Sequence, residues 1–410
     1  MTAVILSSIL LFTLQFMRRI DTKNIKAATY LAFALIPLSG FVLDIYIPSL
    51  PEMSSQLHTT PAAIQLTLSI YLITYGISQL LIGAFLDSVG RFLPSTTALF
   101  LFSLSSFYIA NADSTKSIYL MRAFQGIMVA TIVVSKRASF FDLYAGEKLK
   151  HYTSLFSVIW SAAPIIAPFL GGFLQVNYGW RSNFYFLGIF GIILMMLEIL
   201  FSGESIVEKH PFKLKQIISD YTAMLRTRDF TTGIIVLALA YSILMVYNMS
   251  SPFLVEKIMH YPANITGNAA LFSGVAMMAG GLLAKYYIDK PFTVKIKITF
   301  GIQITGAILV MFINQWYNTM YTLLAYITIL HIGTGFIFNT VFSYCLTRFA
   351  TNGGKASGLS GGGYIIFTAA FSFGVIRSLS IDSQFWLGTS YLILVLITVF
   401  LFLRTKWINN

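Results

Sequence analysis

Two oppositely charged residues, Asp44 and Arg122, stand within stretches of sequence that are otherwise apolar. Asp44 lies seven residues before Pro51, and Arg122 lies six residues after Lys116. In membrane helices rising about 1.5 Å per residue, both would lie about 9–10 Å below the same surface. A carboxylate and a guanidinium at equal depth can interact directly or through water, which predicts a protonation site. The alternatives are a static ion pair or an aspartate that stays hydrated.

Two further ionisable side chains, Glu198 and His331, are secondary candidates for a function. Glu198 lies close to the end of its apolar stretch, so we expect its carboxylate to reach water. His331 is central in its stretch, beside Gly333 and Gly335. A histidine there can titrate near neutral pH or, when neutral, hydrogen-bond between closely packed helices.

A third set of candidates is small and polar and follows helical spacings of three, four and seven residues. This set comprises Gln65, Ser69, Gly76, Gln79 and Gly83. Such spacing places them along one face of a helix. That face either lines a cavity or packs closely on another helix, and both alternatives stay open.

The elements that must position these residues are apolar helices. The 410-residue chain is 57% hydrophobic and only 10% charged, with a mean hydropathy of +0.77. Soluble domains carry roughly 25% charged residues, and a membrane-spanning helix needs about 20 apolar residues. The sequence therefore predicts an all-α polytopic membrane protein. The twelve expected spans lie near residues 27–50, 62–86, 93–112, 117–136, 151–174, 183–201, 230–250, 265–288, 292–313, 319–344, 357–378 and 384–403.

The net charge of +12 is explained by the way the basic residues are distributed between the two sides of the predicted membrane. Of the 27 basic residues, 22 lie in the segments on the same side as the N-terminus, four lie on the other side, and Arg122 lies within a span. This distribution follows the positive-inside rule and predicts cytoplasmic N- and C-termini, so it excludes nucleic acid as the reason for the charge. The single cysteine, Cys345, lies in a predicted span and permits no intramolecular disulfide.

The longest polar interval divides the chain into six spans plus six. We expect a segment 1–26, a six-helix bundle 27–201, a central cytoplasmic loop 202–229, a second bundle 230–404 and a tail 405–410. Residues 1–17 are apolar but lack the features of a signal peptide, and seventeen residues is the short limit for a span. We therefore expect an interfacial segment or a misassigned start, neither of which disturbs the topology, in preference to a thirteenth span. Six plus six spans are typical of parallel-repeat transporters, whose substrate site lies near the midplane between the halves.

Enzyme signatures are absent from the sequence. It contains no HExxH, GxSxG or P-loop motif and no Cys/His cluster with metal-ligand spacing. We therefore expect no catalysis, no metal and no cofactor, and any active transport must use an ion gradient. Asp44 is a titratable acid, which favours protons and the proton motive force; sodium is the alternative.

Three motifs, in order, resemble those of the major facilitator superfamily. The run from Gly83 to Arg91, which includes Asp87 and Gly90, resembles its G-x-x-x-D-x-x-G-R signature loop. The run from Met121 to Gly126 resembles the R-x-x-Q-G element of its fourth helix. A third region looks like the fifth-helix antiporter element and the entry to the sixth helix of twelve-helix drug:proton antiporters; it contains Pro164, Pro168, Gly171, Gly172 and the run from Trp180 to Phe184.

Further runs resemble the Bcr/CflA multidrug efflux group: Leu43 to Pro51, Gln65 to Tyr71 and Ser251 to Phe253. The resemblance implies two six-helix bundles, with Asp44 as the proton and substrate acid and Arg122 as its partner. Gln65, Ser69 and Tyr71 are then expected to contact substrate. Gly83, Asp87, Gly90 and Arg91 are expected to form a gating loop that closes the cytoplasmic side.

The chain departs from the family at two places. Ser88 and Phe92 stand where the family loop usually has basic residues, which implies a weaker closure of that side. Ala163 or Ala167 stands where the antiporter element usually has a glycine before proline, so the motif supports the fold more strongly than the direction of transport.

These observations together predict a proton-coupled exporter of an amphipathic small molecule in a bacterial inner membrane, working by alternating access as a monomer. Its partners would be the substrate, protons and the lipid bilayer. The alternatives are a dedicated exporter of one self-made metabolite such as a siderophore, a proton-coupled importer, or a non-transporting receptor or assembly factor.

Overall fold

The structure is a computed structural model that describes residues 19–349 and 353–407, so the expectations for residues 1–17 lie outside the described residues. The regular structure in these ranges is helical, apart from one isolated β-bridge between Arg19 and Glu204. The helices of the first half are η1 (Thr22–Asn24), α2 (Ile25–Leu35), α3 (Leu38–Asp44), η2 (Ile47–Ser49), α4 (Leu50–Gln56), α5 (Pro61–Val89), α6 (Phe92–Ala110), α7 (Thr115–Leu143), α8 (Gly146–Ser154), α9 (Phe156–Tyr178) and α10 (Arg181–Phe201).

The second half begins after a non-helical segment, residues 202–213. Its helices are α11 (Leu214–Leu225), α12 (Arg228–Phe253), the π-helix η3 (Leu254–Ile258), α13 (Ala263–Tyr286), α14 (Phe292–Ile313), α15 (Met320–Tyr326), the π-helix η4 (Ile327–His331), α16 (Ile332–Arg348), α17 (Gly353–Leu379) and α18 (Gln384–Arg404). The predicted central loop 202–229 therefore contains a helix, α11.

Each of the twelve predicted spans coincides with a helix or a run of consecutive helices. Within the described ranges, eleven of these runs are long and apolar enough to cross a membrane. The predicted fifth span corresponds to α9, a 23-residue helix that carries Pro164 and Pro168 in its interior. The first span is built from short pieces, α2, α3, η2 and α4, because Pro37, Pro48 and Pro51 cannot donate the backbone hydrogen bonds of a continuous helix.

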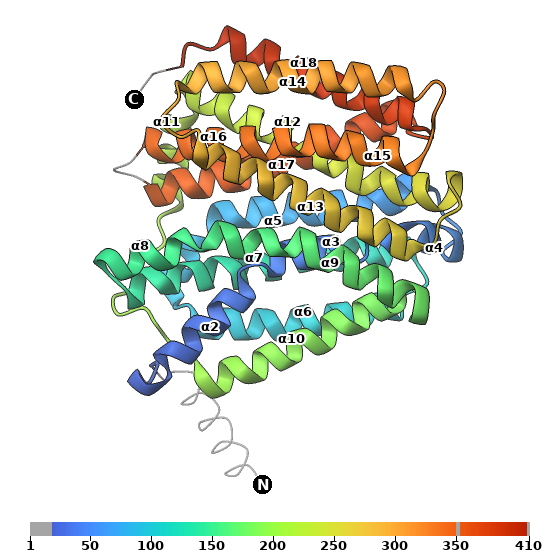
Figure 1. Ribbon diagram of the computed structural model, residues 1–410. Helices are drawn as coiled ribbons and strands as arrows, with labels where there is room; N and C mark the ends of the chain where they lie inside the picture. Colours follow the sequence, from blue (N-terminus) through green and yellow to red (C-terminus); the bar gives the residue numbers. More distant parts are fainter. Residues whose placement is uncertain (1–18, 350–352, 408–410) are drawn as a thin grey trace.

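The helices of the two halves lie side by side and run in roughly the same direction (Figure 1). Within the first half α5 packs on α7 and α6 on α10, and within the second half α12 packs on α17 and α13 on α16. The halves meet along two helix pairs, α5 with α17 and α9 with α13. Helix α12 is buried along most of its length and therefore lies in the interior of the bundle, where η2 and α4 of the first span contact it.

Glycines let the two halves approach to backbone contact. A Cβ atom on Gly76 of α5 would lie 2.9 Å from the carbonyl oxygen of Gly362 on α17. A Cβ atom on Gly267 of α13 would lie 2.6 Å from the carbonyl oxygen of Pro168 on α9. Small residues are what permit such close crossing of membrane helices. The small face predicted on residues 65–83 is therefore, at Gly76, a packing surface.

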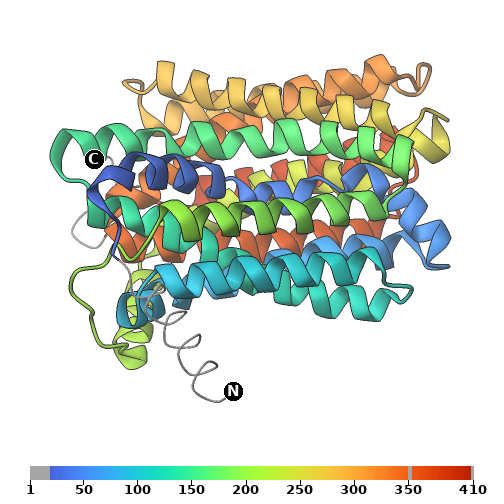
Figure 2. The ribbon, with the colours of Figure 1, turned by 90° about the horizontal axis from the view of Figure 1, so that it is seen from below.

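One end of the bundle, which we call the linker end, carries the α5–α6 connection, the C-terminus of α7, residues 202–213 and α11. Figures 1 and 2 place α8 and α11 at this same end. The opposite end carries the connections α4–α5, α6–α7 and α9–α10.

Candidate functional site

Asp44 occupies the last position of α3, and the next short helix of the broken first span, η2, contacts α12 and α13 of the second half. Its side chain is buried, with 1% of the residue exposed. The Nδ2 atom of Asn248 on α12 donates a hydrogen bond to Asp44 Oδ1 at 3.4 Å. The carboxylate predicted from sequence is therefore joined to the opposite half of the protein.

A second hydrogen bond crosses between the halves at the next residue of α12. Gln65 on α5 donates from Nε2 to the carbonyl oxygen of Met249 at 2.7 Å. Gln65 is itself buried, so this amide occupies an interior position. The two hydrogen bonds tie neighbouring residues of α12 to α3 and to α5, and both must break if the halves separate here.

Arg122 on α7 is completely buried, and aromatic rings and amides surround it. Its guanidinium carbon lies 4.8 Å from the centre of the Tyr46 ring and 4.4 Å from that of Tyr71, distances at which cation–π attraction operates. Its Nη1 atom donates to Gln125 Oε1 at 2.8 Å and to the Val42 carbonyl oxygen at 3.3 Å.

The two tyrosines are themselves held by hydrogen bonds. The Tyr71 hydroxyl donates to the Ser39 carbonyl oxygen at 2.8 Å, and the Tyr46 hydroxyl lies 2.9 Å from Thr67 Oγ1. Tyr71, a predicted substrate contact, thus packs against the Arg122 guanidinium in this structure.

Asp44 and Arg122 form no ion pair in the part of the chain that the structure describes. Each residue takes a different neutral partner, Asn248 for the acid and Gln125 for the base. The alternatives of a static ion pair and of a hydrated surface aspartate are therefore both wrong. Protonation and substrate contact at these residues stay predictions.

Ser69, the other predicted substrate contact on α5, is also buried. Its Oγ atom has no hydrogen-bond partner among the described residues. The Nε and Nη2 atoms of Arg122 are likewise unpaired within the described chain. These free polar groups lie in the first half and leave hydrogen-bonding capacity for water or a ligand.

The predicted gating loop, residues 83–91, lies at the linker end and is held by ion pairs within the loop and to α7. Arg91 pairs with Asp87 at 3.2 Å and binds both carboxylate oxygens of Asp142, at 2.5 and 3.0 Å. Gly90 has a φ of 111°, a conformation that favours glycine. Ser205 from the linker donates to the same Asp142 at 2.6 Å.

Glu204, in the linker, binds the end of this loop through its carboxylate. Its carboxylate accepts hydrogen bonds from the backbone N–H groups of Arg91 and Phe92 at 2.9–3.2 Å, which lie at the N-terminus of α6. Negative charge is favourable at that position because it satisfies free helix donors. The sequence motifs do not reveal Glu204 and Asp142, because neither residue belongs to the signature loop.

The linker reinforces the same loop through its basic residues. Lys209 Nζ donates to the Val89 carbonyl oxygen at 2.8 Å, and the His210 N–H donates to the Asp87 carbonyl oxygen at 2.9 Å. The linker that joins the halves therefore packs against the gating loop. The weaker closure inferred from Ser88 and Phe92 stays a prediction. The loop nevertheless has hydrogen-bond partners in the linker, which lie outside the signature motif.

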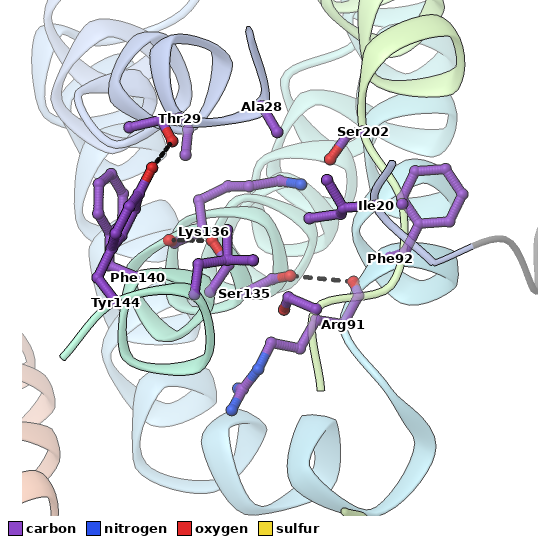
Figure 3. A pocket seen from close by; sticks show the side chains of 15 residues that line it. Ile20, Ala28, Thr29, Arg91, Phe92, Ser135, Lys136, Phe140, Tyr144 and Ser202 are labelled. Carbon is purple, nitrogen blue, oxygen red and sulfur yellow. Dashed lines mark hydrogen bonds between the residues drawn. The ribbon is translucent and has the colours of Figure 1, made fainter. Parts of the chain in front are cut away.

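Glu198 does not reach water, so that expectation is wrong. It is fully buried on α10, and its carboxylate pairs with Lys136 Nζ at 2.5 Å. Lys136, the last residue of the predicted span 117–136, lies within α7, which extends to Leu143. Burial of both charges is possible because each neutralises the other. A cavity of about 10 Å³ beside Lys136 has room for about one water molecule (Figure 3).

The predicted antiporter residues face the junction of α9 with its neighbours. Gly171 lies against the Ile45 carbonyl group, immediately after Asp44, and a Cβ atom on Gly172 would lie 2.9 Å from the Ala263 carbonyl oxygen. Pro168 contributes the carbonyl group that meets Gly267. These residues thus shape the contact between α9, the broken first span and the second half.

His331 lies apart from these residues, at the end of the π-helix η4. Its Nδ1 atom is 2.7 Å from Ser273 Oγ on α13, and its ring packs edge-on to Tyr247 at 5.1 Å. These contacts lie within the second half, so the structure does not join His331 to Asp44. Within the described residues, no group of three His, Cys, Asp or Glu side chains gathers where it could hold a metal ion.

The fold and site together define a multi-pass α-helical membrane protein in which two halves meet at a buried carboxylate. A family model described as Major Facilitator Superfamily matches residues 30–376, so the chain belongs to this superfamily of transporters.

The chain also resembles individual members of the superfamily. It is 26% identical over 342 residues to the Uncharacterized MFS-type transporter YdgK of Bacillus subtilis strain 168, covering 82% of this chain and 85% of that one. It is 24% identical to Multidrug resistance protein D of Escherichia coli strain K12, covering 80% and 83%. Among solved structures, a D-xylose-proton symporter aligns with a TM-score of 0.67 at 16% identity, over 92% and 96% of the two chains, which supports the fold alone.

Proposed function

We propose that this protein is a proton-coupled secondary transporter that exports an amphipathic small molecule across a bacterial inner membrane, with the linker end in the cytoplasm. The observation that carries the proposal is the buried Asp44 carboxylate bound by Asn248 of the other half. A titratable group between two rigid bundles is protonated differently when either side opens to water. Multidrug export is supported by the similarity to Multidrug resistance protein D and by the Bcr/CflA-like motifs.

In the proposed cycle the halves separate at the linker end, and Asn248 and Met249 of α12 leave Asp44 and Gln65. A donor group of the substrate then takes the place of the Asn248 amide, and binding favours loss of the proton from Asp44. The halves rock, the substrate leaves at the opposite end, and a proton from that side returns to Asp44. Each turn thus exchanges substrate for protons.

Arg122 has a supporting role in this cycle. Its charge lies in the same half as Asp44 and is held by Tyr46, Tyr71 and Gln125. It keeps a positive potential close to the acid without neutralising it in an ion pair, so that Asp44 stays free to exchange a proton. Gln65, Ser69 and Tyr71 provide hydrogen-bonding groups to substrate once the halves part.

The experiment that tests the proposal uses inverted vesicles that contain the purified protein, an imposed pH gradient and a panel of drugs. We expect substrate uptake that depends on the gradient and falls by at least about tenfold in Asp44→Asn, which cannot release a proton. Gradient-dependent uptake that survives in Asp44→Asn would remove this residue from the cycle. Failure of a folded protein to transport any panel drug would favour a dedicated metabolite exporter or an importer.

A further inference from the structure

Helix α11 bridges the two halves at the linker end. The Tyr221 hydroxyl donates to the Leu80 carbonyl oxygen on α5 at 3.0 Å, and Asp220 pairs with Lys355 on α17 at 2.6 Å. Met224 is buried on the same side of the helix. One face of α11 is therefore fixed to the protein, and through it the helix touches both bundles.

A second, apolar face of α11 is left largely exposed by the part of the chain that the structure describes. Leu214, Ile218 and Leu225 are separated by four and seven residues, which places them on one stripe of the helix next to the Tyr221 side. They are 44%, 54% and 44% exposed. We call these three residues the apolar stripe. A stripe of three large aliphatic side chains is unfavourable in water and indicates an apolar neighbour.

The position at which α11 contacts α5 indicates what this apolar neighbour is. Leu80 lies nine residues before the end of α5, about 13 Å inside the helix end. On this part of α5 the outward side chains Ile77, Leu81 and Phe85 are apolar and exposed, as expected where a membrane helix faces lipid. The helix α11 therefore reaches α5 at the level where the hydrocarbon of the bilayer meets its headgroups.

The charges around the apolar stripe are predominantly basic. Between residues 207 and 228 the chain has five basic residues and two acidic ones, Glu208 and Asp220, and Asp220 already pairs with Lys355. Lys213, Lys215 and Arg226 are exposed on α11 and its ends. A helix with an apolar face flanked by Lys and Arg has the chemistry that binds an anionic lipid surface.

We propose that α11 is an interfacial anchor that inserts its apolar stripe among anionic lipids of the leaflet at the linker end, with Lys213, Lys215 and Arg226 on their phosphates. The inference goes beyond the proposed function and does not depend on substrate or coupling ion. Because α11 also holds α5 to α17, lipid binding stabilises the closed arrangement of this end of the bundle.

The test compares two single-cysteine labels on full-length protein in vesicles. Ile218→Cys places a fluorescent label in the apolar stripe, and Ala223→Cys places it on the opposite, exposed face. The native Cys345 is buried, so the wild-type chain measures background labelling. Quenching by doxyl groups on lipid chains reports depth in phosphatidylcholine vesicles with and without phosphatidylglycerol.

We expect the Ile218 label to be quenched about threefold more than the Ala223 label, with quenching that rises with phosphatidylglycerol and falls with added salt. Lys213→Gln, Lys215→Gln and Arg226→Gln, combined in the Ile218→Cys chain, should remove the dependence on phosphatidylglycerol. Equal quenching at both positions would overturn insertion of the apolar stripe. Quenching at Ile218 that ignores phosphatidylglycerol would overturn recognition of anionic lipid.

Discussion

The centre of the molecule and its linker end hold their charges in opposite ways. At the centre, Asp44 and Arg122 are buried separately, and each is bound by a neutral amide, Asn248 or Gln125. At the linker end, Arg91 is paired with Asp87 and Asp142, and Lys136 is paired with Glu198. Paired charges favour one fixed arrangement, whereas a carboxylate bound by an amide can gain or lose a proton while keeping a hydrogen bond. The charges at the centre are therefore suited to proton exchange, whereas the ion pairs at the linker end are suited to holding that end in one closed arrangement.

The largest expected effect comes from breaking the buried pair at the linker end. Lys136→Met leaves the Glu198 carboxylate buried without its partner, which should cost about 3–5 kcal/mol of stability. The midpoint of thermal unfolding of the purified protein measures it. Lys136→Met combined with Glu198→Leu should regain most of the loss, because no unpaired charge remains. A single variant as stable as the wild type would show that this pair does not fix the first half.

Neutralising Glu204 should loosen the linker end while sparing the centre. Glu204→Gln removes the negative charge of the side chain that accepts hydrogen bonds from the Arg91 and Phe92 N–H groups. We expect this to lower the local free energy of unfolding by about 1–3 kcal/mol. Hydrogen–deuterium exchange should become faster for the amides of residues 90–92 and stay unchanged near Asp44. The matched control is Glu208→Gln, since Glu208 is exposed. Equal exchange in both variants would contradict a role for the Glu204 carboxylate.

At the centre, removing the amide that faces Asp44 should lower transport without unfolding the protein. Asn248→Leu deletes a hydrogen bond to a carboxylate that the proposed cycle re-forms each time the halves close, a loss of about 1.5 kcal/mol in the closed state. Because every turn of the cycle passes through that state, we expect a rate lower by about tenfold. Gradient-driven uptake in inverted vesicles measures the rate. Asn339→Leu is the control, because Asn339 donates to Gly335 within its own helix. Similar rates in the two variants would remove Asn248 from the site.

The smallest expected effect concerns the contact between α11 and α5. Tyr221→Phe removes the hydroxyl that donates to Leu80 and should cost about 0.5–1.5 kcal/mol, seen as faster amide exchange in α11. The ion pair between Asp220 and Lys355 still holds the helix, so global unfolding should not shift measurably. Tyr321→Phe, at a highly exposed position, provides the control. Unchanged exchange in α11 would mean that the ion pair alone docks this helix.

Sequence alone predicted the twelve spans and the burial of Asp44 and Arg122, because apolar length and charge distribution follow directly from the cost of placing polar groups in lipid. It could not predict Asn248, since an asparagine is informative only when its neighbour in the other half is known. It also mistook Glu198 for a residue at the surface. Distance from a helix end does not reveal a lysine on another helix, and Lys136 lies 62 positions away in the chain.

The glycine contacts between the two halves have a mechanical consequence. Where Gly76 meets Gly362, the side chains of Ile366 and Leu80 also pack against the two glycines. At Gly267, in contrast, the nearest atoms of α9 are backbone atoms of Pro168 and Phe169. Interlocked side chains resist tilting, because each must change its rotamer before the helices can turn against each other. The contact between α9 and α13 at Gly267 lacks this resistance, so these two helices can tilt against each other there with fewer rotamer changes than α5 and α17 need at Gly76.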